Sequence, residues 1–399
     1  MARHPLEVAD IVRAHRAELQ EARGGELPAA ESRVLRDIAS CRTEILGGHV
    51  ERCDQCGHER IAYNSCRNRH CPKCLQGARQ AWLAARESEL LPVEYFHVVF
   101  TIPQELALIA FHNKKLVYKL LMRTAADTLL KIGADPKHLG AKLGVLAILH
   151  TWGQNLQHHP HVHCVVTGGG IAPDGERWIA CRPGFFLPVR ILSRVFRGKF
   201  LAALKRAHAR GALVFHGKLA ALEDAANFRG YLAPLREKNW VVYAKRPFGG
   251  PARVLKYLGR YTHRVAISNQ RLVAMEDGHV SFVWKDYAHD CRRRVLKLTC
   301  VEFLRRFLMH VLPKGFVRIR HYGVFANRKR QEKLERCRTL IDAQRETPEP
   351  SSSSTAPSEH RRTCGACPIC AVGAMMFFGL VERNQLRHIQ AAVAVVDTS

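Results

Sequence analysis

Four histidines fall within six residues, between positions 158 and 163, and imidazoles are common metal ligands. Residues 161–167 are otherwise β-branched and apolar, which predicts a short β-strand. Because successive side chains on a strand point to opposite faces, His161 and His163 share one face. Two imidazoles placed in this way can bind one divalent cation and leave its other coordination positions open. The alternative is a strand whose histidines are buried and hydrogen-bonded for structural reasons only.

Tyr257 and Tyr261 are candidate nucleophiles. The residues before them, 249–251, are Gly-Gly-Pro and predict a helix start, and a separation of four residues places both hydroxyls on one helical face. A tyrosine hydroxyl can attack phosphorus and form a covalent phosphotyrosine. That linkage preserves the energy of the cut bond, so a free 3′-OH can reverse the reaction without ATP. Two such tyrosines allow two successive strand transfers at one site.

Six of the 14 cysteines lie between residues 41 and 74. Cys53-x-x-Cys56 and Cys71-x-x-Cys74 are separated by 14 residues, which matches a structural zinc site closed by four thiolates. The neighbouring donors could bind a second zinc ion, or Cys66 or His70 could exchange into the first site. These donors are Cys41, His49, Cys66 and His70.

Three further cysteines, Cys364, Cys367 and Cys370, lie near the C-terminus. They offer three thiolates and no fourth, so a zinc knuckle there would need His360 or His388 as its last ligand. A tail without fixed structure is the alternative.

The composition favours a polyanionic partner. Lys and Arg number 62 against 35 Asp and Glu, a formal net charge of +27, and nucleic acid is the first candidate. No apolar run is long enough to span a bilayer and no signal peptide opens the chain, so we expect a cytoplasmic protein with reduced cysteines and no membrane partner. The candidate DNA contacts, each of which could instead be part of a solvated basic face, are Arg292, Arg293, Arg294, Arg318, Arg320, Arg328, Lys329 and Arg330.

The pattern of apolar residues predicts the elements that carry these groups. Strands are expected at 95–102, 144–152 and 161–167, a turn at the glycines 168–170, and a helix at 295–312. The same pattern predicts three consecutive domains. These are a helical and zinc-binding domain at 1–92, a catalytic domain with a DNA-binding surface at 93–335, and a linker with a cysteine-containing tail at 336–399.

Four segments together resemble a known family. The His-Val-His triplet within residues 159–163 resembles the motif of the HUH superfamily of single-strand nucleases, in which U is an apolar residue. With the segments 150–156, 257–268 and 66–74, the chain is similar to the two-tyrosine rolling-circle transposases of insertion sequences of the IS91 type, including their N-terminal zinc-binding domain.

The resemblance implies an α+β fold, with an HUH nuclease-like, mostly antiparallel sheet flanked by helices and preceded by a small zinc-binding domain. It implies a transposase that nicks and joins single-stranded DNA at hairpin-containing element ends through a 5′-phosphotyrosine at Tyr257 or Tyr261. Mg²⁺ or Mn²⁺ would serve catalysis and Zn²⁺ the structure, and host replication or helicase proteins would assist. The superfamily adds a third metal ligand beside the two histidines, for which we favour Gln154 over His159 and His150.

Other functions share part of this pattern. A replication initiator or a relaxase would have the same histidines and a tyrosine helix, although the zinc domain and the paired tyrosines favour a transposase. A zinc-dependent DNA-binding protein without catalysis would bind DNA and form no covalent adduct. A metal-dependent hydrolase, in which water attacks, would cut DNA without an adduct.

Overall fold

The computed structural model describes residues 5–184, 186–245, 253–254, 259, 266–286, 292–344, 363–381 and 394–395. The chain divides into two compact units. The terminal unit comprises Met1–Ala78, Ile267–Leu308 and Pro348–Ser399, and the central unit comprises Arg79–Ala266 and Met309–Thr347. The predicted domains are consecutive along the chain, whereas these units are not. In the described part of the chain, no helix is long and apolar enough to cross a membrane.

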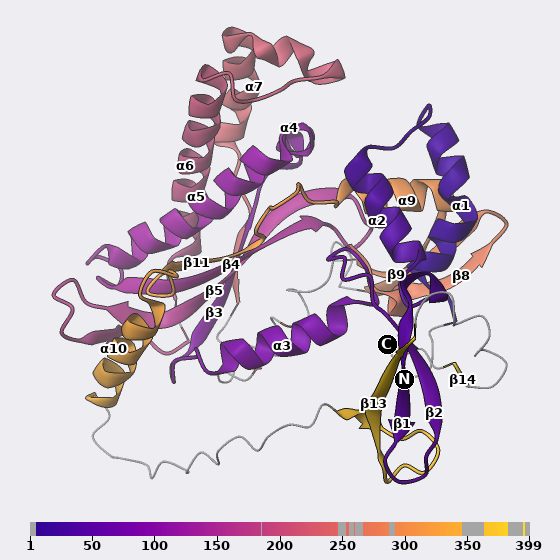
Figure 1. The fold of residues 1–399 in the computed structure, drawn as a ribbon. Helices are drawn as coiled ribbons and strands as arrows, with labels where there is room; N and C mark the ends of the chain where they lie inside the picture. The colour runs from indigo at the N-terminus through magenta and orange to yellow at the C-terminus, as the bar shows by residue number, and fades with distance from the viewer. Residues whose placement is uncertain are drawn as a thin grey trace. The chain divides into compact units, whose positions relative to one another are not determined.

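A six-stranded sheet forms the centre of the central unit, with β5 between β4 and β3 (Figure 1). The strand order is β11-β4-β5-β3-β7, with β6 paired to β5, and every pair is antiparallel. This arrangement confirms the predicted α+β class with an antiparallel sheet. The strands are β3 (Tyr95–Thr101), β4 (Lys142–Trp152), β5 (His158–Ile171), β6 (Trp178–Ala180), β7 (Val242–Lys245) and β11 (Ile319–Gly323).

The alternation of side chains along β5 gives its two faces different neighbours. Val162, Cys164 and Val166 lie in the main hydrophobic core with residues of α5 and α6, the helices drawn along one side of the sheet in Figure 1. Val165 lies in a second cluster with residues of α10. His161 and His163 have the parity of Val165, so they share its face. The helices are α4 (Ala107–His112), α5 (Lys114–Ala134), α6 (Val189–Ala209), α7 (Ala225–Glu237) and α10 (Arg330–Asp342), with short 3₁₀ turns at Gln104–Leu106 and Gly217–Glu223.

The glycines 168–170 do not form the predicted turn, because they continue β5. Their role is close packing. A Cβ on Gly168 would lie 2.8 Å from the carbonyl oxygen of Glu94, and one on Gly170 would overlap the backbone of Lys142. The three glycines therefore lie where neighbouring backbone approaches β5 too closely for a side chain to fit.

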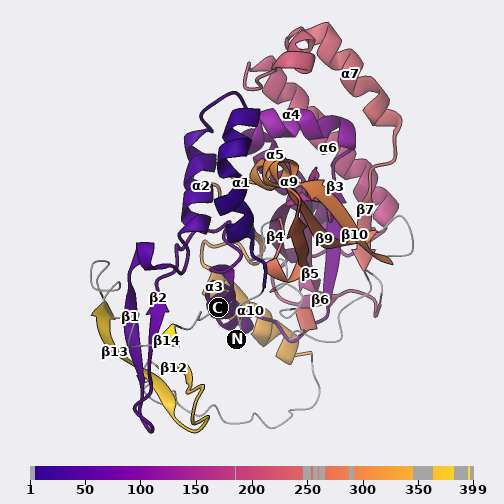
Figure 2. The same ribbon diagram turned by 90° about the vertical axis from the view of Figure 1, so that its right-hand side faces the viewer.

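The terminal unit contains a helical pair and two small sheets, one of which includes the C-terminal strands. One sheet has the order β12-β13-β1-β2-β14 and the other β10-β9-β8. Figure 2 shows the C-terminal β13 beside the N-terminal β1 and β2. The elements are α1 (Val8–Ala22), α2 (Ala29–Ala39), β1 (Gly48–Cys53), β2 (Glu59–Tyr63), β8 (Leu272–Glu276), β9 (His279–Asp286), β10 (Arg292–Thr299), β12 (Thr363–Ala366), β13 (Ala374–Val381) and β14 (Ala394–Val395), with 3₁₀ turns at Glu44–Leu46 and Asn269–Arg271.

Two helices, α3 (Leu75–Glu87) and α9 (Cys300–Met309), extend across the division between the units. The predicted helix at 295–312 is wrong over its first turns, since residues 295–299 belong to β10. There β9 supplies the backbone partners, with Arg292 opposite Asp286 and Thr299 opposite His279. A neighbouring strand has overridden the local helical pattern.

Candidate metal and strand-transfer site

Three histidines of the central sheet meet on one face. His150 on β4 is directly opposite His161 on β5, and His163 follows two residues along β5. One ligand atom from each of the three lies within 4.8 Å of the other two. His150 is 2% exposed and His163 8% exposed, so the cluster is largely shielded from water. Three convergent imidazoles are a donor set suited to a divalent transition metal.

Hydrogen bonds orient two of these rings. The Nδ1 atom of His161 lies 2.7 Å from the carbonyl oxygen of His159 and must donate to it, so its Nε2 carries the lone pair. The Nδ1 atom of His163 lies 2.8 Å from Nε2 of His97, and the two rings are nearly parallel. His97 comes from β3 and is 2% exposed. A partner of this kind fixes the orientation of a metal-binding imidazole.

Burial keeps the histidines of this region neutral. It lowers the pKa of His161 to about 4, so the ring retains a lone pair at neutral pH. His158 and His310 belong to the same unit, and burial lowers the pKa of each to about 3. The Nε2 atom of His158 is 2.7 Å from the hydroxyl of Tyr118, and His310 contacts the carbonyl oxygen of Leu156 at 3.0 Å. These two histidines are therefore structural.

The other candidates for the third ligand lie close by. Gln154 is in the connection between β4 and β5, and its role as a ligand stays a prediction. His159 is half-buried in β5, and its carbonyl oxygen is the group that orients His161. The sequence named His150 as a candidate but favoured Gln154, because the position of His150 opposite His161 depends on the register between two strands.

Tyr257 and Tyr261 lie outside the described residues. Val254, three positions before Tyr257, is described and fully buried. It belongs to the cluster that contains Ile148 and Val165, each two residues from a histidine of the site and on the same face. Val254 itself is therefore on the histidine side of the sheet.

The cysteines form two groups of four in the terminal unit, and both differ from the predicted grouping. The Cys41 cluster brings together Cys41, Cys66, Cys71 and Cys74, with 3.3 Å between the sulfurs of Cys41 and Cys74. The Cys53 cluster brings together Cys53, Cys56, Cys367 and Cys370.

The predicted quartet must therefore be corrected, because β1 and β2 carry the first knuckle, Cys53 and Cys56, away from Cys71 and Cys74. His49 and His70 are not members of either cluster. His49 bonds Glu51 through its Nε2 at 3.1 Å, and His70 bonds the side chain of Asn68.

Two family descriptions match the sequence. "Transposase zinc-binding domain" matches residues 11–102, and "Putative transposase" matches residues 144–333. The chain is 56% identical over 384 residues to the protein named "Putative transposase y4qJ" of Sinorhizobium fredii, covering 94% of this chain and 96% of the relative. It is 27% identical over 320 residues to the transposase for insertion sequence element IS801 of Pseudomonas savastanoi pv. phaseolicola, covering 76% of this chain and 72% of the relative.

The chain belongs to the IS91-type transposases. It is a DNA transposase of the rolling-circle type, with endonuclease and strand-transferase activity, and its N-terminal segment is a zinc-binding domain. The predicted family and activity are confirmed. A conjugative relaxase, TrwC, solved with mutant oriT DNA, is 18% identical with a TM-score of 0.23, covering 35% of this chain and 54% of that chain. A TM-score this low does not establish a shared fold.

The predicted DNA contacts of this transposase lie in both units. Arg292, Arg293 and Arg294 are exposed on β10, an edge strand of the terminal unit. In the central unit, Arg328 and Lys329 are exposed and Arg318 and Arg320 are half-buried. Arg330 forms an ion pair with Glu89 at 2.9 Å, which partly neutralises it. A role in DNA binding stays a prediction for all of them.

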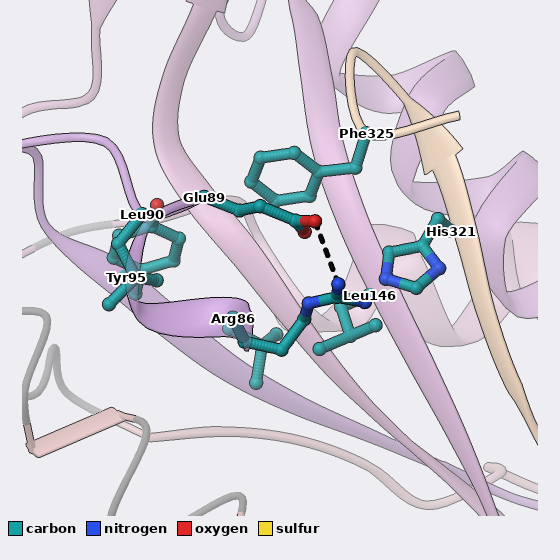
Figure 3. Close-up of a pocket in the computed structure, with 8 residues that line it drawn as sticks. Arg86, Glu89, Leu90, Tyr95, Leu146, His321 and Phe325 are labelled. Carbon is teal, nitrogen blue, oxygen red and sulfur yellow. Dashed lines mark ion pairs between the residues drawn. The ribbon is translucent and has the colours of Figure 1, made fainter. Parts of the chain in front are cut away.

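A small cavity opens on the histidine face of the central sheet (Figure 3). Its volume of about 30 Å³ has room for about two water molecules, so it cannot hold a nucleotide. The ion pair between Arg86 and Glu89, at 2.8 Å, crosses it. The lining residues are Arg86, Glu89, Leu90, Tyr95, Leu146, Val165, His321 and Phe325.

Proposed function

We propose that this transposase cuts and joins single-stranded DNA through Tyr257 and Tyr261, beside a divalent cation held by His150, His161 and His163. The observation that carries the proposal is the convergence of three imidazole ligand atoms within 4.8 Å on a buried sheet face. Three ligand atoms this close to one another can coordinate one cation together. His150 thus takes the place that Gln154 had in the sequence prediction.

The donor set bears on the identity of the cation. Mg²⁺ prefers oxygen ligands, whereas imidazole suits transition metals. The three histidines therefore fit a transition-metal cation better than Mg²⁺, and of the two cations predicted from the sequence only Mn²⁺ is a transition metal. A cation bound there would supply Lewis-acid polarisation of a phosphodiester oxygen. Two features of the site favour metal binding. Burial keeps His161 neutral, so its ring nitrogen retains a lone pair, and the contact with His97 fixes the orientation of His163.

The tyrosines supply the nucleophile. The phenolic oxygen of Tyr257 or Tyr261 attacks phosphorus, the bond to the 3′ oxygen breaks, and that oxygen leaves as a 3′-OH while the 5′ phosphate stays on tyrosine. Attack by a 3′-OH on the phosphotyrosine reverses these bonds and joins the strands. Val254 supports this role, because it lies three positions before Tyr257 and is buried in the cluster on the histidine face.

The substrate and the zinc ligands complete the proposal. Hairpin-containing single strands at the element ends are the proposed substrate, with host replication or helicase proteins supplying strand opening. The Cys41 cluster, whose four residues all lie within the matched zinc-binding domain, holds the zinc of that domain. Four thiolates are a closed structural zinc site.

One assay tests the chemistry. Full-length protein is incubated with labelled single-stranded DNA from an element end and Mn²⁺ or Mg²⁺, and the products are separated on a denaturing gel. We expect a covalent protein–DNA adduct that disappears in Tyr257→Phe/Tyr261→Phe and in His161→Ala/His163→Ala. The matched control is Tyr243→Phe, since Tyr243 is 53% exposed on β7 and should not affect the adduct. An adduct that survives in the double tyrosine variant refutes the assignment, and cutting without any adduct would mean that water attacks.

A further inference from the structure

The Cys53 cluster joins two segments that are far apart in the chain. Cys53 ends β1 and Cys56 lies in the connection to β2, whereas Cys367 and Cys370 lie between β12 and β13. Only the first pair falls within the matched zinc-binding domain, residues 11–102. The second pair follows the long sequence that builds the central unit.

The sulfur separations fit a zinc ion. The Sγ atoms of Cys53 and Cys370 are 3.7 Å apart, those of Cys56 and Cys367 are 3.6 Å apart, and all four lie within 4.8 Å of one another. Sulfurs bound to zinc at about 2.3 Å in a tetrahedron are about 3.8 Å apart. A disulfide would bring them to about 2.05 Å. The geometry is therefore that of a thiolate metal site, and it is not that of two disulfides.

The two knuckles share one backbone design. The amide of Gln55 lies 3.4 Å from the sulfur of Cys53, and the amide of Ile369 lies 3.4 Å from the sulfur of Cys367. In each knuckle the first cysteine's carbonyl oxygen also accepts from the residue four positions on, at 3.2 Å and 3.1 Å. Amides directed at sulfur stabilise the thiolate, which is the form that binds metal.

The two segments fit closely at this point. Asp54 accepts a hydrogen bond from the amide of Ala374 at 2.8 Å and donates its own amide to the carbonyl oxygen of Ala374 at 3.1 Å. A Cβ on Gly373 would overlap the sulfur of Cys53, so only glycine permits this approach. β13 then pairs with β1 along its length.

Apolar packing alone gives this junction little support. The buried cluster here consists of Cys53, Cys367 and Met375, with Cys370 packed against it. Elsewhere on β13, Val381 is buried against Ile61 at the far end of the strand, whereas Phe377 is 52% exposed, Phe378 55% and Leu380 78%. The thiols thus occupy the place of a hydrophobic core, a situation in which small domains usually need a bound metal.

We propose that Cys53, Cys56, Cys367 and Cys370 bind a second structural zinc ion, which attaches the C-terminal segment to the N-terminal zinc-binding domain. The chain then carries two closed four-thiolate sites, one within the family's domain and one that spans its two ends. The C-terminal cysteines need no histidine ligand, because β1 and β2 supply the missing pair.

Zinc content of the purified full-length protein tests the number of sites. We expect two zinc ions per chain in the natural protein, and one in Cys367→Ser/Cys370→Ser and in Cys53→Ser/Cys56→Ser. The matched control is Cys181→Ser, which removes a half-buried thiol of the central unit and should leave two. One zinc ion in the natural protein, or two in Cys367→Ser/Cys370→Ser, would overturn the proposal.

Two further variants separate the site from its rivals. A knuckle built by the C-terminal segment alone requires Cys364, so loss of zinc in Cys364→Ser, together with retention in Cys53→Ser/Cys56→Ser, would overturn the shared site. Cys370→His replaces a thiolate by another zinc ligand, so this variant should still hold two zinc ions per chain. That result would show that the serine variants lose zinc because they lose a ligand and not because they misfold.

The attachment has its own test. A protease site placed at residues 351–354 allows the chain to be cut before the C-terminal cysteines. We expect the released fragment to co-elute with the rest of the protein in zinc, and to separate after addition of a chelator or in Cys367→Ser/Cys370→Ser. Separation in the presence of zinc, or persistence after complete removal of zinc, would refute the attachment. None of these measurements depends on DNA cleavage, so they stand apart from the tyrosine proposal.

Discussion

Acidification should destabilise the central unit through two buried histidines. Burial lowers the pKa of His158 and of His310 to about 3, whereas the same side chains titrate near 6.5 in the unfolded chain. Between these values only the unfolded chain binds the protons. The stability that the neutral rings contribute is therefore present above about pH 6.5 and is lost as the pH falls toward 3.

The size of the effect follows from the two pKa values. At pH 5 the unfolded chain gains about 2 kcal/mol per histidine relative to pH 7, and the folded chain gains almost nothing. The two histidines together should lower the free energy of unfolding by about 4 kcal/mol over this range. Below pH 6 each contributes a slope of about 1.4 kcal/mol per pH unit.

Urea unfolding, followed by tryptophan fluorescence between pH 7 and pH 5, measures this slope. Trp152 is a local probe, because its ring centroid lies 6.1 Å from that of His310. His158→Gln and His310→Gln should each remove about 2 kcal/mol of the stability loss between pH 7 and pH 5. His216→Gln, at an exposed position, is the matched control and should leave it unchanged. Protonation of the cysteine clusters affects every variant alike, so curves parallel to the natural protein in both Gln variants would refute the reasoning.

Two further outcomes are expected. His97→Phe removes the group that orients His163, so the affinity for Mn²⁺ measured by calorimetry should fall about 10- to 100-fold. His97→Gln, which keeps a hydrogen-bonding side chain, should recover part of that affinity. Equal affinity in the natural protein and both variants would show that His97 does not position the ligand. Gly170→Ala should lower the free energy of unfolding in urea by about 1–3 kcal/mol, because the new Cβ would overlap the backbone of Lys142. Gly198→Ala, which has open space around it in α6, should not lower it. Equal effects of the two substitutions would show that Gly170 is not required for close packing.

The strands of the catalytic sheet could be predicted because their signal is local. Runs of β-branched and apolar residues identified β3, β4 and the centre of β5, and the period of two placed His161 and His163 on one face. The same signal does not rank the partners of those histidines, so the sequence named His150 only as a less favoured third ligand and did not identify His97. His150 and His97 reach them only through the register of β5 with β4 and β3, and pairing between strands is not written in either strand alone.

The grouping of the cysteines could not be predicted from the sequence either, because the two halves of one site are far apart along the chain. Spacing identifies a knuckle, because Cys-x-x-Cys closes a turn by local hydrogen bonds, and both Cys53-x-x-Cys56 and Cys367-x-x-Cys370 have that turn. Spacing does not show which two knuckles share an ion, since any two of them supply the four thiolates of a tetrahedral zinc site. The nearest knuckle in sequence, Cys71-x-x-Cys74, is the natural guess, yet the strand pairing of β1 with β13 selects one more than 300 residues away. Assignment of such sites therefore depends on the sheet that brings the knuckles together, and a C-terminal cysteine pair of this kind should be considered a ligand set before it is considered a tail.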